Sequence, residues 1–385
     1  MKRVVVAIYT DPDFYPPTIN AILNLAGHFD EVVVVSRNNS KTDFPFPQNV
    51  SLRKTGKCIS VADAEKKGVG YKIISFTQFV LKLLSNAANR KTSLLIIYDP
   101  FPLLAFSLIR KFIPRRIKTW YHNHDMPDSS LTRKYTIGGY AAVKEHATMR
   151  YIDYFSLPSQ DRLAFYSNWQ RPANYFYIPN YPSLQVYTER PERSKQTDTC
   201  RIIFQGAIGE GHALEEIIEL LTEKIENRSL QLIVKGPVRE PYKQKLTQLA
   251  VAAGVLERLT WIGIGPYAEL PQLTSSCDIG TAIYMGKDNI SRTLGTASNK
   301  IYEYAASGLP VILYDDSPFT RYLQEYKWTF FTNGSKDDLR DTIATILKEI
   351  DDAGKQAFTD FSNGLNFEKA FLSSLNTVLK AIGED

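Results

Sequence analysis

Two of the five histidines in the chain lie in one short segment, where their spacing could serve catalysis or metal binding. His122 and His124 follow an apolar run that ends at Tyr121, and Asp125 comes next. A histidine pair with an aspartate could bind a metal ion, but a third ligand from elsewhere in the chain is missing, so no metal is expected. Two interpretations stay open: histidines that are buried for structural reasons, or side chains that face a substrate in a cleft.

A second group of polar residues lies in the segment 298–308, which is predicted to form a helix. Ser298 or Asn299 can cap this helix, and Asn299 and Glu303 share one of its faces because they are four residues apart. A carboxylate one turn into a helix can accept hydrogen bonds from two adjacent ribose hydroxyls, while Lys300 or the helix N-terminus meets phosphates. The alternative is a surface helix in which Lys300 and Glu303 form a weak ion pair.

Glycines and a lysine at the ends of two predicted strands could hold a diphosphate. Gly206, Gly209 and Gly211 follow the strand predicted at 202–205 and precede a helix, so backbone N–H groups could approach an anion. Their spacing is not G-x-G-x-x-G, which disfavours a nicotinamide dehydrogenase. Lys235 ends the next predicted strand and could contact the same diphosphate. Taken alone, the glycine loop is equally compatible with an ordinary flexible turn, and Lys235 alone is better explained as a solvated loop lysine.

These residues need elements to position them, and strand-like apolar runs alternate with helical segments along nearly the whole chain. The expected strands are Val4–Ile8, Val32–Val35, Leu94–Tyr98, Lys118–Tyr121, Tyr154–Leu157, Ile202–Gln205, Leu230–Val234, Leu259–Gly263, Ile279–Tyr284 and Val311–Tyr314. The expected helices include Thr18–Gly27, Ile73–Asn86, Leu103–Phe112, Ala213–Glu226 and Phe367–Ile382. Such alternation predicts an α/β fold with two Rossmann-like, doubly wound domains, in which ligands bind beyond the carboxyl ends of the strands.

Composition at one internal segment indicates where the two domains meet. Residues 1–185 are expected to form the first domain, followed by a polar linker at 186–199 and a second domain at 200–362. The last segment, 363–385, is expected to be a helix that can pack back on the first domain.

Overall composition restricts the class of protein. The chain has 385 residues, 44% hydrophobic and 23% charged, which is typical of a folded protein with two domains. Three scattered cysteines indicate reduced thiols and a cytoplasmic location. A net charge of +5 does not imply nucleic acid as a partner. Five basic residues within 110–118 are either the solvated end of a helix or a patch for peripheral contact with an anionic inner membrane face.

At this point the second half of the chain resembles a known family. The run 299–312 is similar to the donor-site helix of retaining family-4-type glycosyltransferases (glycosyltransferase group 1, with GT-B architecture). Segments 204–209 and 211–215 resemble the first strand, glycine loop and helix of the same domain, and 259–263 and 277–280 resemble its later strands. The resemblance implies two domains that face a cleft, with the acceptor on the weakly similar first domain. It also implies a nucleoside-diphosphate sugar as donor substrate, with no cofactor and no metal.

The resemblance also implies roles for individual residues. In the family, a histidine at the carboxyl end of the strand that corresponds to Lys118–Tyr121 faces the donor sugar and the reacting centre. His124 is the first choice for this histidine, and His122 is the second. Glu303 would bind the donor ribose, Lys235 the pyrophosphate and Tyr284 the side of the donor sugar. The catalytic candidates are His124, His122 and Glu303, and the donor-binding candidates are Gly206, Ala207, Lys235, Tyr284, Thr296, Ala297, Ser298, Asn299, Lys300 and Glu303.

Two departures from the family pattern affect the donor site. The family often has a glutamate eight residues before the position of Glu303, and this chain has Gly295 there. It also often has an arginine and a lysine in the first glycine loop, which this chain lacks, so Lys235 with Lys300 or Arg292 would supply the positive charge. Asp11-Pro12-Asp13 resembles the manganese motif of other glycosyltransferases but follows a first strand, so it is expected to line the acceptor cleft or cap a turn.

The expected function is therefore transfer of a sugar from a nucleoside-diphosphate sugar to an acceptor hydroxyl with retention of configuration. The acceptor would be a saccharide or a lipid-linked molecule, as in bacterial polysaccharide or glycoconjugate synthesis. Three other functions stay open: a catalytically silent nucleotide-sugar-binding subunit, which fits Gly295; a sugar-nucleotide epimerase of the same architecture; and, with least support, a dehydrogenase.

Overall fold

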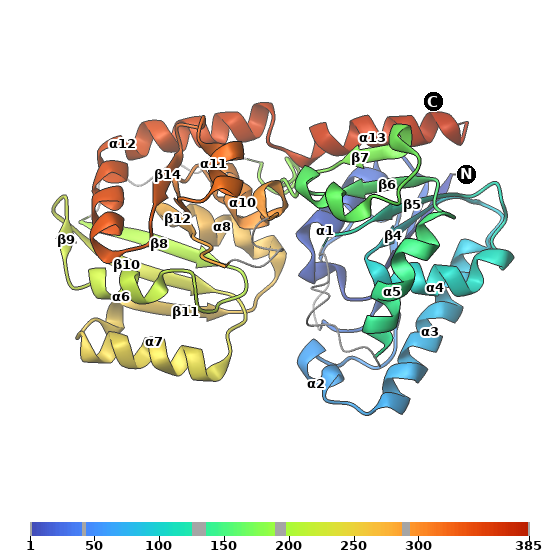
Figure 1. Cartoon of the computed structure of the whole chain (residues 1–385), viewed down its shortest axis with the longest axis horizontal. Helices are drawn as coiled ribbons and strands as arrows, with labels where there is room; N and C mark the ends of the chain where they lie inside the picture. Colours follow the sequence, from blue (N-terminus) through green and yellow to red (C-terminus); the bar gives the residue numbers. More distant parts are fainter. Residues whose placement is uncertain (1, 41–43, 125–135, 189–197, 287–292, 384–385) are drawn as a thin grey trace. The chain divides into compact units, whose positions relative to one another are not determined.

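The computed structural model describes residues 2–40, 44–124, 136–188, 198–286 and 293–383, and its contacts divide the chain into two compact units (Figure 1). Unit 1 comprises Met1–Pro179 and Phe367–Asp385, and unit 2 comprises Asn180–Asn366. Each unit has its own parallel sheet covered by helices, which confirms the prediction of two doubly wound α/β domains.

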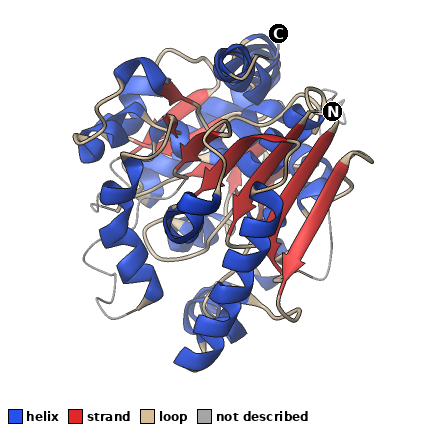
Figure 2. Cartoon of the chain, turned by 90° about the vertical axis from the view of Figure 1, so that its right-hand side faces the viewer, coloured by secondary structure: helices blue, strands red, loops and turns tan. Residues whose placement is uncertain are grey.

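Unit 1 contains a sheet whose strands run in the order β3-β2-β1-β4-β5-β6-β7, all of them parallel (Figure 2). The strands are β1 (Arg3–Ile8), β2 (Glu31–Arg37), β3 (Val50–Thr55), β4 (Thr92–Tyr98), β5 (Lys118–His122), β6 (Tyr154–Leu157) and β7 (Tyr175–Tyr177). The central strands are apolar and fully buried because helices cover both of their faces. Since every strand is parallel, the carboxyl ends of β1, β4 and β5 meet at one edge of the sheet.

The helices of unit 1 form two layers, one on each face of this sheet. The apolar side chains of α3 (Val69–Ala87), α4 (Pro100–Ile109) and α5 (Ile137–Met149) pack with one face, and those of α1 (Pro16–Ala26) and α13 (Phe367–Ala381) pack with the other. Helix α13 follows unit 2 in the sequence, yet its Phe371 stacks on Trp120 of β5 with the ring centroids 5.4 Å apart. A short helix, α2 (Val61–Glu65), precedes α3.

Unit 2 has a second sheet, with the strand order β11-β10-β8-β12-β13-β14 and the short β9 paired with β10. Its strands are β8 (Thr199–Gln205), β9 (Lys224–Ile225), β10 (Arg228–Lys235), β11 (Leu259–Gly263), β12 (Ile279–Ala282), β13 (Val311–Tyr314) and β14 (Thr329–Thr332). Its helices are α6 (Leu214–Leu220), α7 (Glu240–Ala252), α8 (Leu270–Ser275), α10 (Asn299–Ala306), α11 (Ser317–Leu323) and α12 (Lys336–Asn363). Two separate apolar clusters, one on each side of the sheet, hold these helices.

Several elements differ from the expectation. The helix expected over Ala213–Glu226 ends at Leu220, and residues 224–225 form β9 instead. Glu226 and Asn227, with φ angles of 48° and 64°, then reverse the chain from β9 into β10, with which β9 pairs antiparallel. The expected strand Ile279–Tyr284 ends at Ala282. Strands β3, β7, β9 and β14 were missed; β7 has only three residues, all of them partly exposed.

The boundary between the units also differs from the sequence-based one. Contacts place it between Pro179 and Asn180, whereas a break near residue 185 was expected. The physical reason is Asn180, whose backbone N–H donates to the Thr296 carbonyl at 3.0 Å and whose Nδ2 donates to the Ala297 carbonyl at 2.8 Å. The residues that follow therefore belong to unit 2 before the polar stretch begins. Within the described residues, no helix combines the length and apolar character that a bilayer span requires.

Candidate functional site

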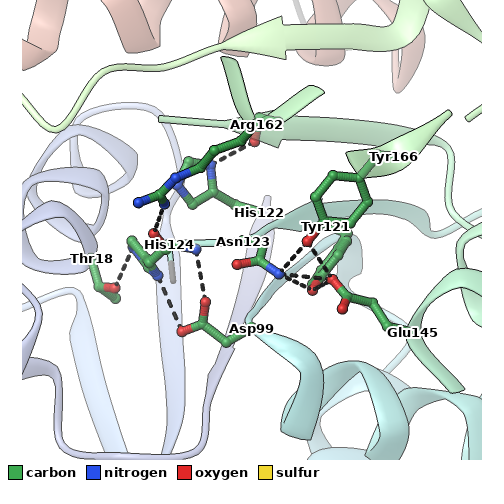
Figure 3. A network of polar contacts seen from close by, with 10 residues as sticks. Thr18, Asp99, Tyr121, His122, Asn123, His124, Glu145, Arg162 and Tyr166 are labelled. Carbon is green, nitrogen blue, oxygen red and sulfur yellow. Dashed lines mark hydrogen bonds and ion pairs between the residues drawn. The ribbon is translucent and has the colours of Figure 1, made fainter. Parts of the chain in front are cut away.

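The two histidines lie at the carboxyl end of β5, and their side chains lie on one side of the backbone (Figure 3). The residues between and before them, Asn123 and Tyr121, point to the other side and join a different hydrogen-bond network. This alternation is the period-2 pattern of an extended chain. The strand end thus separates a histidine pair from a network that anchors the same segment.

His122 is held as a neutral ring. It is buried, with 5% of its surface exposed, and its Nδ1 lies 2.7 Å from the Ser156 hydroxyl of β6. Burial lowers the pKa of His122 well below its ordinary value, and the positive charges of His124 and Arg162 would lower it further. A neutral His122 in this position can orient its neighbours but is poorly suited to carry a proton at neutral pH.

His124 is fixed from three directions. Its backbone N–H donates to Oδ1 of Asp99 at 2.8 Å, and its Nδ1 lies 3.3 Å from Oδ2 of the same carboxylate. Its Nε2 lies 3.4 Å from the hydroxyl of Thr18 on α1, and its ring stacks on Tyr98 with a centroid distance of 4.7 Å. A carboxylate at Nδ1 selects the tautomer of an imidazole and stabilises its protonated form, leaving Nε2 to act on another group.

Asp99 is a candidate site residue that the sequence analysis did not identify. It directly follows β4 and has φ 69° and ψ 166°, a backbone region that side-chain-bearing residues rarely adopt and that costs about 1–3 kcal/mol. The residue with this strained backbone is the one whose carboxylate binds the backbone N–H and the ring of His124. In addition, the backbone N–H of Asp99 donates to the His122 carbonyl at 3.0 Å. The signal available in the sequence was a carboxylate, Asp99, directly after an apolar strand and before Pro100.

A buried network on the other side of the strand end anchors Asn123. Its Nδ2 donates to Oε1 of Glu145 on α5 at 2.7 Å, and the hydroxyls of Tyr121 and Tyr166 donate to the same carboxylate oxygen. Burial raises the pKa of Glu145, although these hydrogen bonds oppose the effect. Arg162 adds a hydrogen bond from its guanidinium to the His124 carbonyl (Figure 3). The segment that carries both histidines is therefore held rigidly by its backbone and its neighbours.

In unit 2, Glu303 lies on α10 with an incompletely satisfied carboxylate. The residue is 4% exposed, and its Oε2 accepts a 2.6 Å hydrogen bond from Nε2 of Gln205 at the end of β8. Among the described residues no hydrogen bond of normal geometry reaches its Oε1, although the nearby Tyr267 hydroxyl lowers the pKa. Burial dominates and raises the pKa of Glu303 to about 7. A buried acceptor without a hydrogen bond costs about 1–3 kcal/mol, which a ligand hydroxyl could recover.

Lys300 lies one turn before Glu303. The sequence left open a surface helix in which these two side chains form a weak ion pair, and the structure does not show that pair. Its side chain is buried, and its Nζ lies 4.0 Å from the ring centroid of Phe204 and 4.7 Å from that of Tyr284. Two aromatic faces stabilise the ammonium group without neutralising it. The positive charge therefore stays available beside Gly206, where an added Cβ would lie 3.1 Å from Nζ.

Two glycines bring the ends of β8 and β10 into close contact. A Cβ on Gly236 would lie 2.0 Å from the carbonyl oxygen of Gly206, and both residues have positive φ angles, 138° and 116°. The Gly206 backbone N–H donates to the Lys235 carbonyl at 2.9 Å. Lys235 itself is half-buried, and burial lowers the pKa of its ammonium group against the opposing charges of Glu269 and Glu303. The predicted glycine loop, basic strand end and carboxylate helix therefore belong to one strand-end cluster.

The remaining predicted donor residues lie at the start of α10 or beside it. The hydroxyls of Tyr284 and Ser298 are 3.4 Å apart, and Ser298 occupies the N-cap position without capping the helix through its side chain. Thr296 and Ala297 offer the two carbonyls that Asn180 binds. Asn299 is half-buried, with no hydrogen bond to its Oδ1 among the described residues, whereas Ala207 is exposed. Arg292, proposed as a source of charge, lies outside the described residues.

The sequence also did not single out His212, which lies next to the Lys300 cluster. Its Nδ1 lies 2.6 Å from the Ile283 carbonyl, and its ring centroid is 4.7 Å from that of Phe204. Burial and then the charge of Lys300 lower the pKa of His212 to about 4. The neutral ring serves to position the loop before α6.

Carboxylates considered for metal binding have other partners. Asp11 is 1% exposed and forms an ion pair with Nζ of Lys54 on β3 at 2.5 Å, and its Oδ1 accepts from the Asp13 N–H within a short turn. Asp125 of the histidine segment lies outside the described residues. In the part of the chain that is described, no group of three potential ligands (His, Cys, Asp or Glu) is close enough to hold a metal ion.

One known protein family matches the segment of the chain that contains Gly206, Lys235, Lys300 and Glu303. Residues 187–357 match the family described as glycosyl transferases group 1. The match spans just under half of the chain and includes β8, α10 and the residues between them. No curated protein matches the chain.

Solved structures with the same fold match this chain over nearly its whole length. HepE from Anabaena, in complex with UDP and glucose, has a TM-score of 0.70 at 13% identity and covers 99% of this chain and 100% of its own. Sucrose-phosphate synthase from Thermosynechococcus elongatus has a TM-score of 0.73 at 12% identity, with both chains fully covered. WaaG, a glycosyltransferase involved in lipopolysaccharide biosynthesis, has a TM-score of 0.63 at 13% identity and covers 96% of this chain and 98% of its own. At these identities the similarity establishes the two-domain fold.

Proposed function

We propose that this chain transfers a sugar from a nucleoside-diphosphate sugar to an acceptor hydroxyl, with retention of the anomeric configuration. The observation that supports it most directly is the buried Glu303 carboxylate, whose Oε1 accepts no hydrogen bond from the described residues. It lies one helical turn from Lys300, within the segment that matches glycosyl transferases group 1. A ribose hydroxyl would complete the coordination of Glu303, and the diphosphate would meet Lys300 and the glycine-rich strand end.

The roles within the donor cluster follow from charge and space. Lys300 and Lys235 would stabilise the negative charge that develops on the leaving diphosphate. Gly206, which has no side chain of its own beside the Lys300 ammonium group, would let phosphate oxygens approach the backbone at the end of β8, and Gly236 lets the end of β10 pack against it. Tyr284 and Ser298, whose hydroxyls adjoin, would contact the sugar-phosphate end. HepE, a structural neighbour, has been solved with UDP-glucose, which is compatible with such a donor.

In unit 1, His124 would act on the donor sugar and the reacting centre. Asp99 holds Nδ1, so Nε2 is the nitrogen available to a substrate hydroxyl, and displacing the weak 3.4 Å contact with Thr18 costs little. Asp99 would not be a nucleophile, because its carboxylate is committed to His124. We therefore infer departure of the diphosphate from the face that the acceptor attacks, with the leaving phosphate assisting deprotonation of the acceptor.

The acceptor would be a saccharide or a lipid-linked molecule in polysaccharide or glycoconjugate synthesis, made at a cytoplasmic location. WaaG, another neighbour, is described as acting in lipopolysaccharide biosynthesis, which is compatible with this class of acceptor. A second candidate function rests on Gly295, which has a φ of 30° and no side chain where the family often has a glutamate. A subunit that binds the nucleotide sugar without turnover would fit this feature.

The first test is nucleotide binding by thermal shift with UDP, GDP, TDP and ADP. A ligand at about 100 times its dissociation constant stabilises the folded protein by about 2.7 kcal/mol, and we expect one nucleotide to do so. Glu303→Ala should abolish the shift, whereas Glu257→Gln, which removes an exposed carboxylate of the same unit, should retain it. If no nucleotide stabilises the wild type, the proposed donor site is wrong.

Turnover then separates the candidate functions. With the matching nucleotide sugar, a transferase releases the nucleoside diphosphate faster when an acceptor is added, and NMR of the product gives the anomeric configuration. A silent subunit binds the donor and releases nothing. An epimerase changes the sugar or frees the nucleotide without any acceptor.

A further inference from the structure

Unit 1 has an open groove at the edge of its sheet, apart from the histidines. It lies between the end of β3 and the outer side of α3, and its volume is about 680 Å³. Lys54, Gly56 and Lys57 line it from the strand side, and Tyr71, Leu81 and Lys82 line it from the helix. In the described part of the chain β3 is the last strand of the sheet, so no further strand pairs with its outer edge there.

The helix wall of the groove combines exposed apolar side chains with the polar Gln78 and Ser85. Residues 71, 74, 78, 81 and 85 of α3 line it and follow one another at helical spacing, so they form a single stripe. Ile74 and Leu81 are each 60% exposed, and Ile73 and Val69 beside them are 52% and 72% exposed. A cluster of large exposed apolar side chains on one helix is typical of an interaction surface.

The surroundings of the groove are strongly basic. Residues 53–91 contain nine lysines and arginines but only Asp63 and Glu65 as acids, a net charge of +7, whereas the whole chain carries +5. Lys54 is paired with Asp11 and Lys66 with Asp63. Lys57 and Lys82 line the groove, and no ion pair to either occurs among the described residues. A groove with an apolar wall and cationic rims is complementary to an anionic amphiphile.

The basic cluster at 110–118, which the sequence suggested for membrane contact, is less suited to this role. The Arg116 guanidinium donates to the carbonyls of Thr92 at 2.6 Å and Arg90 at 2.7 Å, so it holds the start of β4. Arg110 stacks on the Tyr151 ring, with its Cζ atom 3.6 Å from the ring centroid. Two of the five cations are thus engaged within the fold, whereas Lys57 and Lys82 of the groove form no ion pair among the described residues.

We propose that the groove between β3 and α3 binds an anionic membrane lipid, with Lys57 and Lys82 at the phosphate headgroup and Ile74 and Leu81 against the first carbons of its chains. The groove lies beyond the carboxyl end of β3, and the Asp11–Lys54 ion pair links that end to β1. The proposal concerns membrane attachment, and it holds whether or not the donor site transfers a sugar.

The test is co-sedimentation of the whole chain with phosphatidylcholine vesicles, with and without phosphatidylglycerol. We expect binding only to the anionic vesicles, weakened by salt. Lys57→Gln with Lys82→Gln should lower the partition coefficient roughly 25-fold, since each basic residue at an anionic surface contributes about a factor of five. Ile74→Ser with Leu81→Ser should also reduce binding, and because both side chains are exposed the fold should be retained. Lys224→Gln with Lys327→Gln, on unit 2, is the matched charge control and should bind like the wild type.

Three results would overturn the proposal. The wild type could stay in solution with anionic vesicles, or the groove variants could bind as tightly as the control. A concentration-dependent dimer in analytical ultracentrifugation that the Ile74→Ser, Leu81→Ser variant dissociates would assign the groove to a second copy of the chain. Nucleotide thermal shifts on the same variants should be unchanged, which separates failure of this proposal from failure of the donor site.

Discussion

The polar side chains at the carboxyl ends of the strands differ between the two units in how fully they are hydrogen-bonded within the protein. In unit 1, His122 and His124 are buried rings whose nitrogens have protein partners, and a strained Asp99 fixes the second of them. In unit 2, the ends of β8 and β10 pack backbone to backbone at Gly206 and Gly236, the Lys300 ammonium group lies against two aromatic rings, and Oε1 of Glu303 has no hydrogen-bond partner among the described residues. The first arrangement specifies the orientation of a few atoms, and the second leaves a carboxylate oxygen that a ligand can satisfy.

This difference suggests a division of roles. A group that must act on one bond benefits from a fixed position, because small displacements of a reacting group are costly. A site for a charged nucleotide benefits from polar groups that only the ligand satisfies, because these contribute to binding rather than to folding. The predictions below test whether activity depends on hydrogen bonds in unit 1 and binding on glycines and charge in unit 2.

The largest effect is expected at His124. His124→Ala should lower kcat by about 10²–10³, the usual cost of removing a positioned hydrogen-bonding group at a reacting centre, while the nucleotide thermal shift stays unchanged. Asp99→Asn should cause a smaller loss, because asparagine tolerates a positive φ and can still contact the imidazole but no longer selects its tautomer in the same way. Steady-state kinetics measure both. Equal activity of His124→Ala and the wild type would remove unit 1 from the chemistry.

A second effect concerns the contact between the glycines. Gly236→Ala would place a methyl group 2.0 Å from the Gly206 carbonyl oxygen at a φ of 138°, so we expect unfolding to become easier by at least about 2 kcal/mol and nucleotide binding to be lost. Gly209→Ala is the matched control, since an added Cβ there meets nothing within 4 Å. Urea unfolding followed by fluorescence measures the difference. Similar midpoints for the two variants would show that unit 2 adjusts its backbone easily.

The smallest effect is a pH dependence that arises from Glu303. Its pKa in the folded state is about 7, above the unfolded value of 4.5, so the folded state retains a proton and the free energy of unfolding should fall as pH rises from about 4.5 to 7. A ribose that donates hydrogen bonds requires the ionised form, so nucleotide affinity should weaken about tenfold per pH unit below 7. Glu303→Gln should abolish both slopes. Calorimetry in buffers of different ionisation enthalpy would detect the proton released on binding, and its absence would contradict the ribose role.

The sequence predicted the central strands and the two-domain fold well, because buried parallel strands are continuous apolar runs. It placed Glu303 and Lys300 on one helix from their spacing alone. It could not reveal Asp99, whose importance depends on a backbone strain and on a strand that lies next to it only in the folded sheet. Nor could it show that Lys300 would lie against Phe204 and Tyr284, since those rings are 96 and 16 residues away in the chain.

The return of α13 to unit 1 has a consequence for the order of folding. Phe371 of this helix covers Trp120, so the core on that face of unit 1 is complete only when the end of the chain is present. During synthesis, residues 180–366 emerge as a continuous segment and can fold as they leave the ribosome, whereas unit 1 must wait with part of its apolar face uncovered. Ribosome-bound chains that stop before α13 should therefore be sensitive to proteases in the first domain and resistant in the second.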